Sequence, residues 1–270
     1  MTIAAETVEF GDAGTYSFYQ YGSANYNQMC LTSNSDNQDS TGLRVYSGAH
    51  VMARFLASTD GLALLDGKRL GCGTGVIGCV AAVQGNVSDL VLTDGDERAC
   101  ELARRNLDHV VHPIKPELST ACHQLYWGAA YPPPSDHFDV VLGCDLMYYQ
   151  TSVEDLMWTV EALAPSGLFL HVHIFRKDEH GDTMLKVLAT SNRTTLVVPI
   201  PHFIPLAEVS NWPSWLNVCC LVSGPTDQIE ALLKSHPTWS VFATVEATQN
   251  ENFLATEDAH DDLDQYSALQ

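Results

Sequence analysis

A glycine-rich segment followed by a short apolar run most constrains how this chain folds. The segment Leu70-Gly71-Cys72-Gly73-Thr74-Gly75-Val76-Ile77-Gly78 precedes the run Asp89-Leu90-Val91-Leu92-Thr93, which ends on Asp94. A glycine-rich turn that opens a helix lets backbone N–H groups approach a ligand closely, and an acid at the end of the next strand can accept hydrogen bonds from ribose hydroxyls. The pattern therefore predicts a site for a nucleotide-like cofactor.

Two classes of cofactor share these glycines. Gly73-x-Gly75-x-x-Gly78 fits the dinucleotide-binding fingerprint, with Asp94 at about the expected distance. Gly71-x-Gly73-x-Gly75 fits the loop that surrounds the amino-acid end of S-adenosylmethionine. The glycines alone leave both classes open.

Apolar strands alternate with amphipathic helices through the middle of the chain. The sequence predicts strands near 68–71, 89–94, 121–126, 138–144 and 168–175, and helices near 48–58, 76–84, 97–108, 151–164 and 178–191. This alternation predicts a parallel sheet with helices on both faces. Beyond Asn192, the sequence predicts strands over 194–201, 215–223 and 240–246 and a helix over 226–235.

Motifs in a fixed order give the chain its resemblance to a known family. They are Thr41–Ala49 with Met52–Leu56, Leu92–Leu107, Leu125-Tyr126-Trp127-Gly128, Phe138–Tyr148 and Gly167–Arg176. Over about residues 40–200 the chain resembles the seven-β-strand, S-adenosylmethionine-dependent protein-lysine methyltransferases. The resemblance implies the Rossmann-like α/β fold of class I methyltransferases, with a mostly parallel seven-stranded sheet and helices on both faces. Because that sheet ends in an antiparallel pair, one of the three C-terminal strands is expected to be additional.

The resemblance also implies roles for residues at the predicted strand ends. The expected cofactor-binding residues are Gly71, Gly73, Gly75, Asp94, Trp127 and Cys144, and the expected catalytic residues are Asp145 and Tyr148. The glycines would surround the methionine part of S-adenosylmethionine, Asp94 would bind its ribose, and Trp127 would pack on its adenine. Asp145 and Tyr148 form the family's Asp-x-x-Tyr beside the transferred methyl group. The alternative structural roles are a helix cap for either aspartate and a core position for Trp127.

The chain departs from the family pattern at three places. Tyr46 stands where the family has Trp, and Tyr126 stands where it has an acid. The strand before Gly71 is short, because Asp66-Gly67-Lys68-Arg69-Leu70 leaves only about three residues for it. A central parallel strand is normally a buried apolar run, so we expect either Leu62–Leu65 to move into the sheet or the strand to be stunted. A poorly supported loop would weaken the cofactor site and the activity.

The resemblance implies methyl transfer from S-adenosylmethionine to a side chain of a protein substrate, most often lysine. One alternative is an NAD-dependent oxidoreductase, although the chain lacks a catalytic Tyr-x-x-x-Lys or similar pair. The other is a catalytically impaired methyltransferase-like interaction module, which the shortened strand would favour. Both alternatives belong to different functional classes from the enzyme that the motifs predict.

Negative charge is concentrated at the two ends of the chain. The net charge is −20, and residues 1–43 carry five acids and residues 235–270 seven, with no Lys or Arg in either range. We predict an acidic, partly disordered segment over 1–43, a methyltransferase domain over 44–246 and an acidic tail over 247–270. A protein that binds a phosphate backbone needs a basic footprint, so nucleic acid is not an expected partner.

Cysteine usage favours a reducing compartment. The eight cysteines are Cys30, Cys72, Cys79, Cys100, Cys122, Cys144, Cys219 and Cys220, and no two of them form a C-x-x-C pair. Several lie in apolar strands or helices, which predicts reduced core thiols. With no signal peptide or membrane span visible in the sequence, we expect a cytoplasmic protein without membrane contact.

Two further groups of residues have competing interpretations. His171 and His173 alternate on one face of a predicted strand, but no third ligand has matching spacing, so structural histidines are favoured over a metal pair. Tyrosines are frequent near the start of the chain, at Tyr16, Tyr19, Tyr21 and Tyr26. They would either line a substrate groove or cover the core.

Overall fold

The computed structural model describes most of the chain outside its two ends. The described residues are 3–21, 45–72, 75–130, 137–147, 151–175, 187–188, 191–212 and 217–242. Gly73, Tyr26, Tyr148, the tail 247–270 and most of the helix predicted over 178–191 lie outside the described residues. Within the described ranges, every helix is too short or too polar to cross a lipid bilayer.

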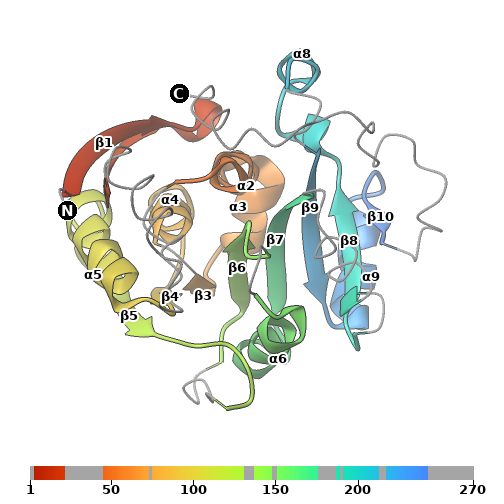
Figure 1. The fold of residues 1–270 in the computed structure, drawn as a ribbon. Coiled ribbons are helices and arrows are strands. Elements are labelled where there is room, and N and C mark those ends of the chain that lie inside the picture. Colours follow the sequence, from red (N-terminus) through yellow and green to blue (C-terminus); the bar gives the residue numbers. More distant parts are fainter. Residues whose placement is uncertain are drawn as a thin grey trace, which may run out of the picture.

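An eight-stranded sheet forms the centre of the molecule (Figure 1). Its strands are β3 (Arg69–Cys72), β4 (Asp89–Asp94), β5 (Ser119–Gln124), β6 (Val140–Cys144), β7 (Leu168–Phe175), β8 (Thr194–Val198), β9 (Asn217–Gly224) and β10 (Ser240–Val241). They lie in the order β10-β8-β9-β7-β6-β3-β4-β5. The pairs from β5 to β7 are parallel, whereas β9 is antiparallel to both β7 and β8. This topology confirms the predicted Rossmann-like fold, and β10, which begins where the strand over 240–246 was predicted, is the additional eighth strand.

Helices cover both faces of this sheet (Figure 1). They are α2 (Ser47–Ala57), α3 (Thr59–Leu65), α4 (Val76–Gln84), α5 (Glu97–Asn106), which continues as the π-turn η3 (Leu107–Val111), α6 (Val153–Leu163), α8 (Leu206–Val209) and α9 (Thr226–Ser235), with the 3-10 turns η1 (Gly11–Ala13) and η4 (Ile200–His202). Buried side chains of α2 and α4 form one apolar cluster with one face of the sheet, and those of α6 form a second cluster with the other face. The predicted apolar stripe of α6 is buried in that second cluster.

The shortened first strand of the domain is paired along its whole length. All four residues of β3 pair with β4, and Leu70 to Cys72 also pair with β6. Arg69 fixes the start of β3, since its backbone N–H donates to Asp139 Oδ2 (2.9 Å) and its Nε donates to Asp89 Oδ2 (2.8 Å). Leu62 to Leu65 remain in the helix α3. Of the two predicted outcomes, the structure shows the stunted strand.

A β-hairpin precedes the domain and was not predicted. Its strands, β1 (Ile3–Glu9) and β2 (Thr15–Tyr21), pair in antiparallel register and pack on the outer side of α5. The side chain of Asn106 is buried there, and both of its polar atoms are satisfied by Tyr19. Its Oδ1 accepts from the Tyr19 backbone N–H (2.7 Å), and its Nδ2 donates to the Tyr19 carbonyl (3.2 Å). Tyr16 packs against the first cluster and Tyr19 against α5. These two tyrosines cover the core.

Arg193 connects three elements on the α6 side of the sheet. Arg193 is 7% exposed, and its guanidinium donates to the carbonyls of Ala164 (3.0 Å), Gly167 and Ser223 (3.1 Å). It also forms an ion pair with Glu161 at 3.0 Å. A planar guanidinium can reach several acceptors at once, which a single-point donor cannot.

We expect Arg193→Met to lower the free energy of unfolding by about 3–5 kcal/mol, because it removes charge-assisted hydrogen bonds to buried carbonyls. Glu161→Gln removes only a half-exposed ion-pair partner, so it should lower the free energy by no more than about 1 kcal/mol. Urea unfolding followed by circular dichroism measures both. Equal losses in the two variants would contradict this role for the carbonyl contacts.

Candidate functional site

The carboxyl ends of the parallel strands meet at one edge of the sheet. Cys72, the last residue of β3, pairs with Leu92 of β4 and Leu142 of β6. Asp94 and Cys144 each follow the paired leucine by two residues, so they lie at the same height on either side of β3. The chain order reverses between β3 and β6, and open α/β sheets bind ligands in the crevice at such a point. This edge is called the rim below.

The described glycines of the predicted loop occupy two different environments. Gly71 lies inside β3, paired with Val91 and Val141, and a Cβ at this position would lie 3.3 Å from the Phe138 ring. Gly75 directly precedes α4 with a φ of +84°, and a Cβ there would lie 2.9 Å from the Cβ of Ala103. A side chain at residue 75 would therefore be strained and would also separate α4 from α5.

An acidic turn follows β4. The backbone N–H of Asp96 donates to Asp94 Oδ1 (2.9 Å), and Asp96 in turn caps α5 by accepting from the Arg98 backbone N–H (2.8 Å). Asp94 is thus held by its own turn, while Asp96 serves as the helix cap and also pairs with the Arg98 guanidinium. Capping α5 was the alternative role for Asp94, and the structure gives this role to Asp96.

The segment after β5 brings two aromatic residues to the rim. Trp127 is half-buried and packs against the second apolar cluster, beside the core of α6. Tyr126 is 48% exposed and lies against Gly95 of the acidic turn, where a Cβ would lie 3.6 Å from its ring. Its hydroxyl accepts from Gln124 Nε2 at 2.8 Å. Tyr126 was noted in the sequence only as a departure from the family pattern, and its contact with Gly95 places it next to Asp94.

Asp145 has an unusual backbone at the end of β6. Its φ is +52°, the left-handed region that Asp tolerates better than most residues, and its N–H donates to the Val172 carbonyl at 2.8 Å. The start of α2 lies against it, because a Cβ at Gly48 would be 3.1 Å from the Cβ of Asp145. The positive end of the α2 dipole therefore faces a carboxylate. Sequence reasoning did not single out Gly48, whose signal is a small residue one position inside a helix start.

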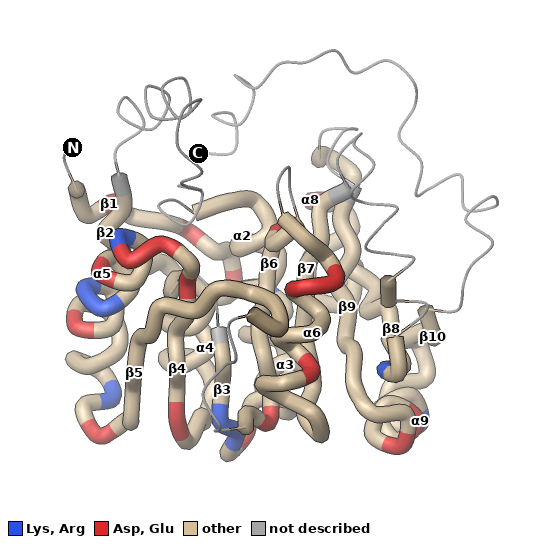
Figure 2. Tube along the Cα trace, turned by 60° about the horizontal axis from the view of Figure 1, so that its bottom comes forward, with Lys and Arg blue, Asp and Glu red and all other residues tan. Residues whose placement is uncertain are grey.

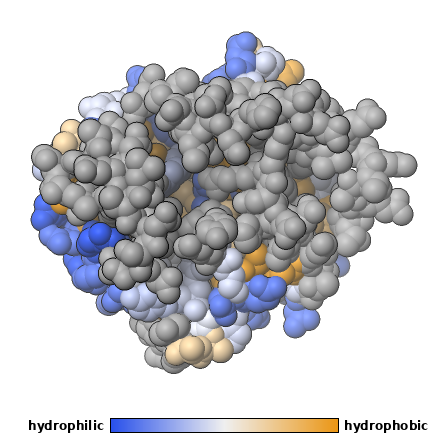
Figure 3. Space-filling view, viewed as in Figure 1, coloured by the Kyte–Doolittle hydropathy of each residue, from blue (hydrophilic) through white to orange (hydrophobic). Residues whose placement is uncertain are grey.

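Acidic side chains gather at the rim, whereas the opposite edge of the sheet carries charges of both signs, because Arg69 lies there beside Asp89 and Asp139 (Figure 2). Figure 2 shows acidic segments where β4 passes into α5 and at the start of α6, away from the basic segment at the start of β3. Asp94, Asp145, Glu154 and Asp155 belong to these strand and helix ends. The exposed side of α5 is hydrophilic (Figure 3), with Glu97, Glu101, Arg104 and Arg105 on it. The rim therefore favours ligands that carry positive charge.

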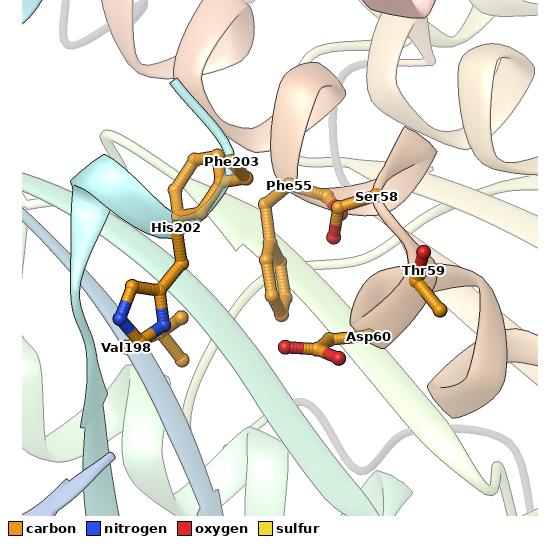
Figure 4. A pocket seen from close by; sticks show the side chains of 7 residues that line it. All are labelled: Phe55, Ser58, Thr59, Asp60, Val198, His202 and Phe203. Carbon is orange, nitrogen blue, oxygen red and sulfur yellow. The ribbon is translucent and has the colours of Figure 1, made fainter. Parts of the chain in front are cut away.

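A small cavity lies away from these residues. It has a volume of about 100 Å³ and is lined by Phe55, Ser58, Thr59, Asp60, Val198, His202 and Phe203 (Figure 4). These residues come from the junction of α2 and α3, from η4 and from the end of β8. None of the predicted site residues lines this cavity, so we place the candidate site at the rim.

His171 and His173 lie side by side on the buried face of β7. Their ring centroids are 5.7 Å apart, and the His171 ring stacks on Phe169 at 5.2 Å. Within the described residues, no three His, Cys, Asp or Glu side chains are placed to hold a metal ion. Both ring nitrogens of His171 are buried, and neither has a hydrogen-bond partner among the described residues. Burial together with the neighbouring His173 holds the pKa of His171 well below its usual value of 6.5.

Comparison with known proteins gives one family. Residues 25–189 match the profile of a family described as lysine methyltransferase. The chain is 28% identical over 163 residues to the protein-lysine N-methyltransferase EFM3 of Chaetomium thermophilum, covering 57% of this chain and 47% of that protein. It is 33% identical over 126 residues to the protein N-lysine methyltransferase METTL21A of Danio rerio, covering 44% and 54%.

A third relative and a solved structure complete the comparison. The chain is 25% identical over 158 residues to the EEF1A lysine methyltransferase 3 of Mus musculus, covering 57% of this chain and 64% of that protein. The matches thus span about half to two thirds of the length of these curated relatives. A solved methyltransferase from Pyrococcus furiosus has 17% identity and a TM-score of 0.44, covering 74% of this chain and 95% of that chain.

We expect acidification to destabilise the protein through His171. Its pKa is lowered in the folded state, so below about pH 6.5 the unfolded chain binds the proton more readily, and stability falls as pH drops from 6.5 toward the folded-state pKa. The contribution is at most about 1.4 kcal/mol per pH unit. Urea unfolding of His171→Leu at pH 7.5 and 5.5 should show a pH difference smaller by about 1 kcal/mol.

The exposed His123 offers a matched control, because its replacement removes a histidine from the surface and leaves the buried pair on β7 intact. His123→Gln should keep the pH dependence of the parent protein. If His171→Leu and His123→Gln behave alike, the buried histidine does not cause the loss of stability in acid.

Proposed function

Because this chain belongs to the lysine methyltransferase family, we propose that it transfers the methyl group of S-adenosylmethionine to a lysine side chain of another protein. The observation that carries this proposal is the family match over residues 25–189, which includes β3 to β7 and thus every strand that ends in a predicted site residue. The free thiols of Cys79, Cys100, Cys122, Cys144, Cys219 and Cys220 support the cytoplasm as its compartment.

The residues of the rim fit S-adenosylmethionine. Gly75 directly precedes α4, so the start of this helix brings unpaired backbone N–H groups to the rim, where they can bind a ligand. Asp94 carries acceptor oxygens for ribose hydroxyls, and its own turn holds it in place. The cofactor also carries a sulfonium and an ammonium group, both cationic, which the acids of the rim favour.

We assign each predicted residue a role in binding the cofactor or the substrate. Gly73, with Gly75, surrounds the methionine part of the cofactor, and Gly71 gives β3 its close packing under Phe138. Asp94 binds the ribose hydroxyls. Trp127, which follows β5, borders the adenine of the cofactor. Cys144, the last residue of β6, borders its methionine part. Asp145 and Tyr148 orient the substrate amine.

The chemistry requires a neutral amine. The ammonium form of lysine has no lone pair, and its ordinary pKa is about 10.4. S-adenosylmethionine, when bound, supplies an electrophilic methyl group in an in-line displacement. The residues of the chain must therefore align the amine, exclude water from it and let a proton leave. A carboxylate at the end of β6 attracts the ammonium form first and then accepts a hydrogen bond from the neutral amine.

The experiment that tests the proposal is calorimetric titration of the purified chain with S-adenosylmethionine and, separately, with NAD. We expect heat from the first and none from the second. A second arm follows deuterated methyl groups from S-adenosylmethionine to lysines in a cell extract by mass spectrometry. Binding of NAD alone would indicate an oxidoreductase. Binding of S-adenosylmethionine with no labelled lysine would indicate an interaction module.

We expect Asp94→Ala to weaken S-adenosylmethionine binding by about 1.5–3 kcal/mol, the range for losing a hydrogen bond to a charged group. The matched control is Asp227→Ala, which removes an exposed acid in the first turn of α9 and should leave the affinity unchanged. Calorimetry gives both dissociation constants. An affinity within about twofold of the parent protein, with an unchanged circular dichroism spectrum, would exclude Asp94 as the ribose ligand.

Asp145→Ala and Tyr148→Phe should reduce methyl transfer and leave cofactor affinity nearly unchanged, because both residues are assigned to the amine. For Asp145→Ala the expected loss in rate is about 10²–10⁴-fold, the range for removing a group that assists proton transfer. Single-turnover rates and calorimetry on the same preparations separate the two effects. An equal loss of cofactor affinity would place these residues in the cofactor site.

A further inference from the structure

Two cysteines, both distinct from the proposed site residues, lie in contact directly behind the acidic turn. Cys100 is on α5 and Cys122 is on β5, so the two side chains meet where this helix packs on this strand. Cys122 Sγ donates to the Cys100 carbonyl (3.4 Å), and Cys100 Sγ lies 3.5 Å from the His123 carbonyl. The Cys122 thiol thus contacts the backbone of Cys100, and the Cys100 thiol contacts the backbone of the residue that follows Cys122. Both are free thiols.

The environment makes the two thiols unequal. Cys100 is buried, whereas Cys122 is partly exposed at the outer strand of the sheet. The pKa of Cys122 is lowered, chiefly by the hydrogen bond from Cys100 and also by the charge of Arg104, whose Nη2 donates to the Cys122 carbonyl at 3.3 Å. Glu97 and Asp94 act in the opposite direction on the pKa of Cys122. The same hydrogen bond, with burial, raises the pKa of Cys100.

Such a pair has the properties of an oxidation site. A thiolate is the form of cysteine that reacts with peroxides, and reactive cysteines are accessible, acidic and placed next to a second thiol. Among the described cysteines, Cys79 and Cys219 provide a contrast. Both are buried, and burial raises the pKa of Cys219 to about 12 and that of Cys79 further. We therefore expect neither of these two thiols to react readily with peroxides.

We propose that Cys122 is a site of oxidation by hydroperoxides and that Cys100 resolves it as a disulfide between β5 and α5. The Cys122 thiolate attacks one peroxide oxygen, so that an S–O bond forms, the O–O bond breaks, and the other oxygen leaves as hydroxide from hydrogen peroxide, or as alkoxide from an organic hydroperoxide, and takes up a proton. Cys100 sulfur then attacks Cys122 sulfur, an S–S bond forms, the S–O bond breaks, and the departing hydroxide takes the Cys100 proton as water. Two thiols are oxidised by two electrons in all, and the hydroperoxide is reduced.

The proposed disulfide lies next to Asp94, the proposed ribose ligand. Cys100 Sγ also lies 3.6 Å from the carbonyl of Asp94, the residue that ends β4. The proposed disulfide consumes the thiol hydrogens that face the carbonyls of Asp94 and Cys100. It joins α5 to β5 where the two elements already pack together, so no large rearrangement is required. This inference depends on the two thiols and does not require the proposed methyl transfer.

The test uses the full chain and hydrogen peroxide. After exposure to about one equivalent of peroxide at pH 7, remaining thiols are alkylated under denaturing conditions and the protein is mapped by mass spectrometry. We expect a peptide containing Cys122 linked to one containing Cys100, with Cys79 and Cys219 fully alkylated. In Cys100→Ser, Cys122 should accumulate as sulfenic acid that dimedone traps. In Cys122→Ser, Cys100 should remain a thiol.

Arg104→Gln supplies a second readout that a passive contact would not change. It should slow the loss of the Cys122 thiol at pH 7 by about threefold or more, because a nearby cation favours the thiolate. Arg105→Gln, which alters the neighbouring arginine and its pair with Glu101, should leave the rate unchanged. Oxidation of the half-buried Cys144 before Cys122, a disulfide from Cys122 to another cysteine, or equal rates in both arginine variants would overturn the proposal.

Discussion

The pairing of β3 on both sides holds the two halves of the sheet together. At four residues it is the shortest of the five parallel strands, and it lies between β4 and β6. Backbone and side-chain bonds from Arg69 to Asp139 and Asp89 fix its first residue to both flanks. Since Leu70 is fully buried and Cys72 pairs with both neighbours, little freedom remains at its other end. The positions of Asp94 and Asp145 relative to each other depend on these few bonds.

Electrostatics at the rim follow from the direction of the strands and helices. Parallel strands end at one edge, and the helices that follow or approach them begin there, so positive helix ends and acidic side chains gather together. Asp145 lies against the start of α2, and Asp94 lies one turn before α5. The helix ends stabilise the carboxylates of the rim, whose negative charges would otherwise repel one another. The remaining acids of the rim can then attract a cationic ligand, while Arg98 pairs with Asp96.

Local patterns predicted the elements whose burial is local. β4, α4, β7 and α9 agree with their predicted ranges residue by residue, because their apolar runs or stripes end at Gly, Pro or charged residues. The hairpin β1–β2 was missed because its strands alternate only weakly, and the apolar surface that they cover, around Ala99 and Leu102, is far away in the sequence.

The features of the candidate site likewise fall into those that local sequence patterns predict and those that depend on tertiary contacts. Glycine spacing and strand ends predicted which residues come to the rim, since these depend on the direction of the chain. The left-handed backbone of Asp145, its contact with Gly48 and the packing of Gly71 under Phe138 arise from tertiary neighbours that no local pattern encodes. Sequence reasoning placed Gly71 both at the end of the strand predicted near 68–71 and in the glycine loop, and the structure shows it inside β3.

The hairpin also has a bearing on where the independently folding unit of this chain begins. Sequence shared with the family starts at residue 25, after both hairpin strands. A fragment cut at that boundary would uncover the side of α5 that carries Ala99 and Leu102, and Asn106, 1% exposed in the whole chain, would lose both of its bonds to Tyr19. An amide left in an apolar surface without partners favours unfolding or self-association. The smallest stable fragment therefore extends N-terminal to the homologous region, and a boundary drawn from shared sequence alone would divide a cooperative unit.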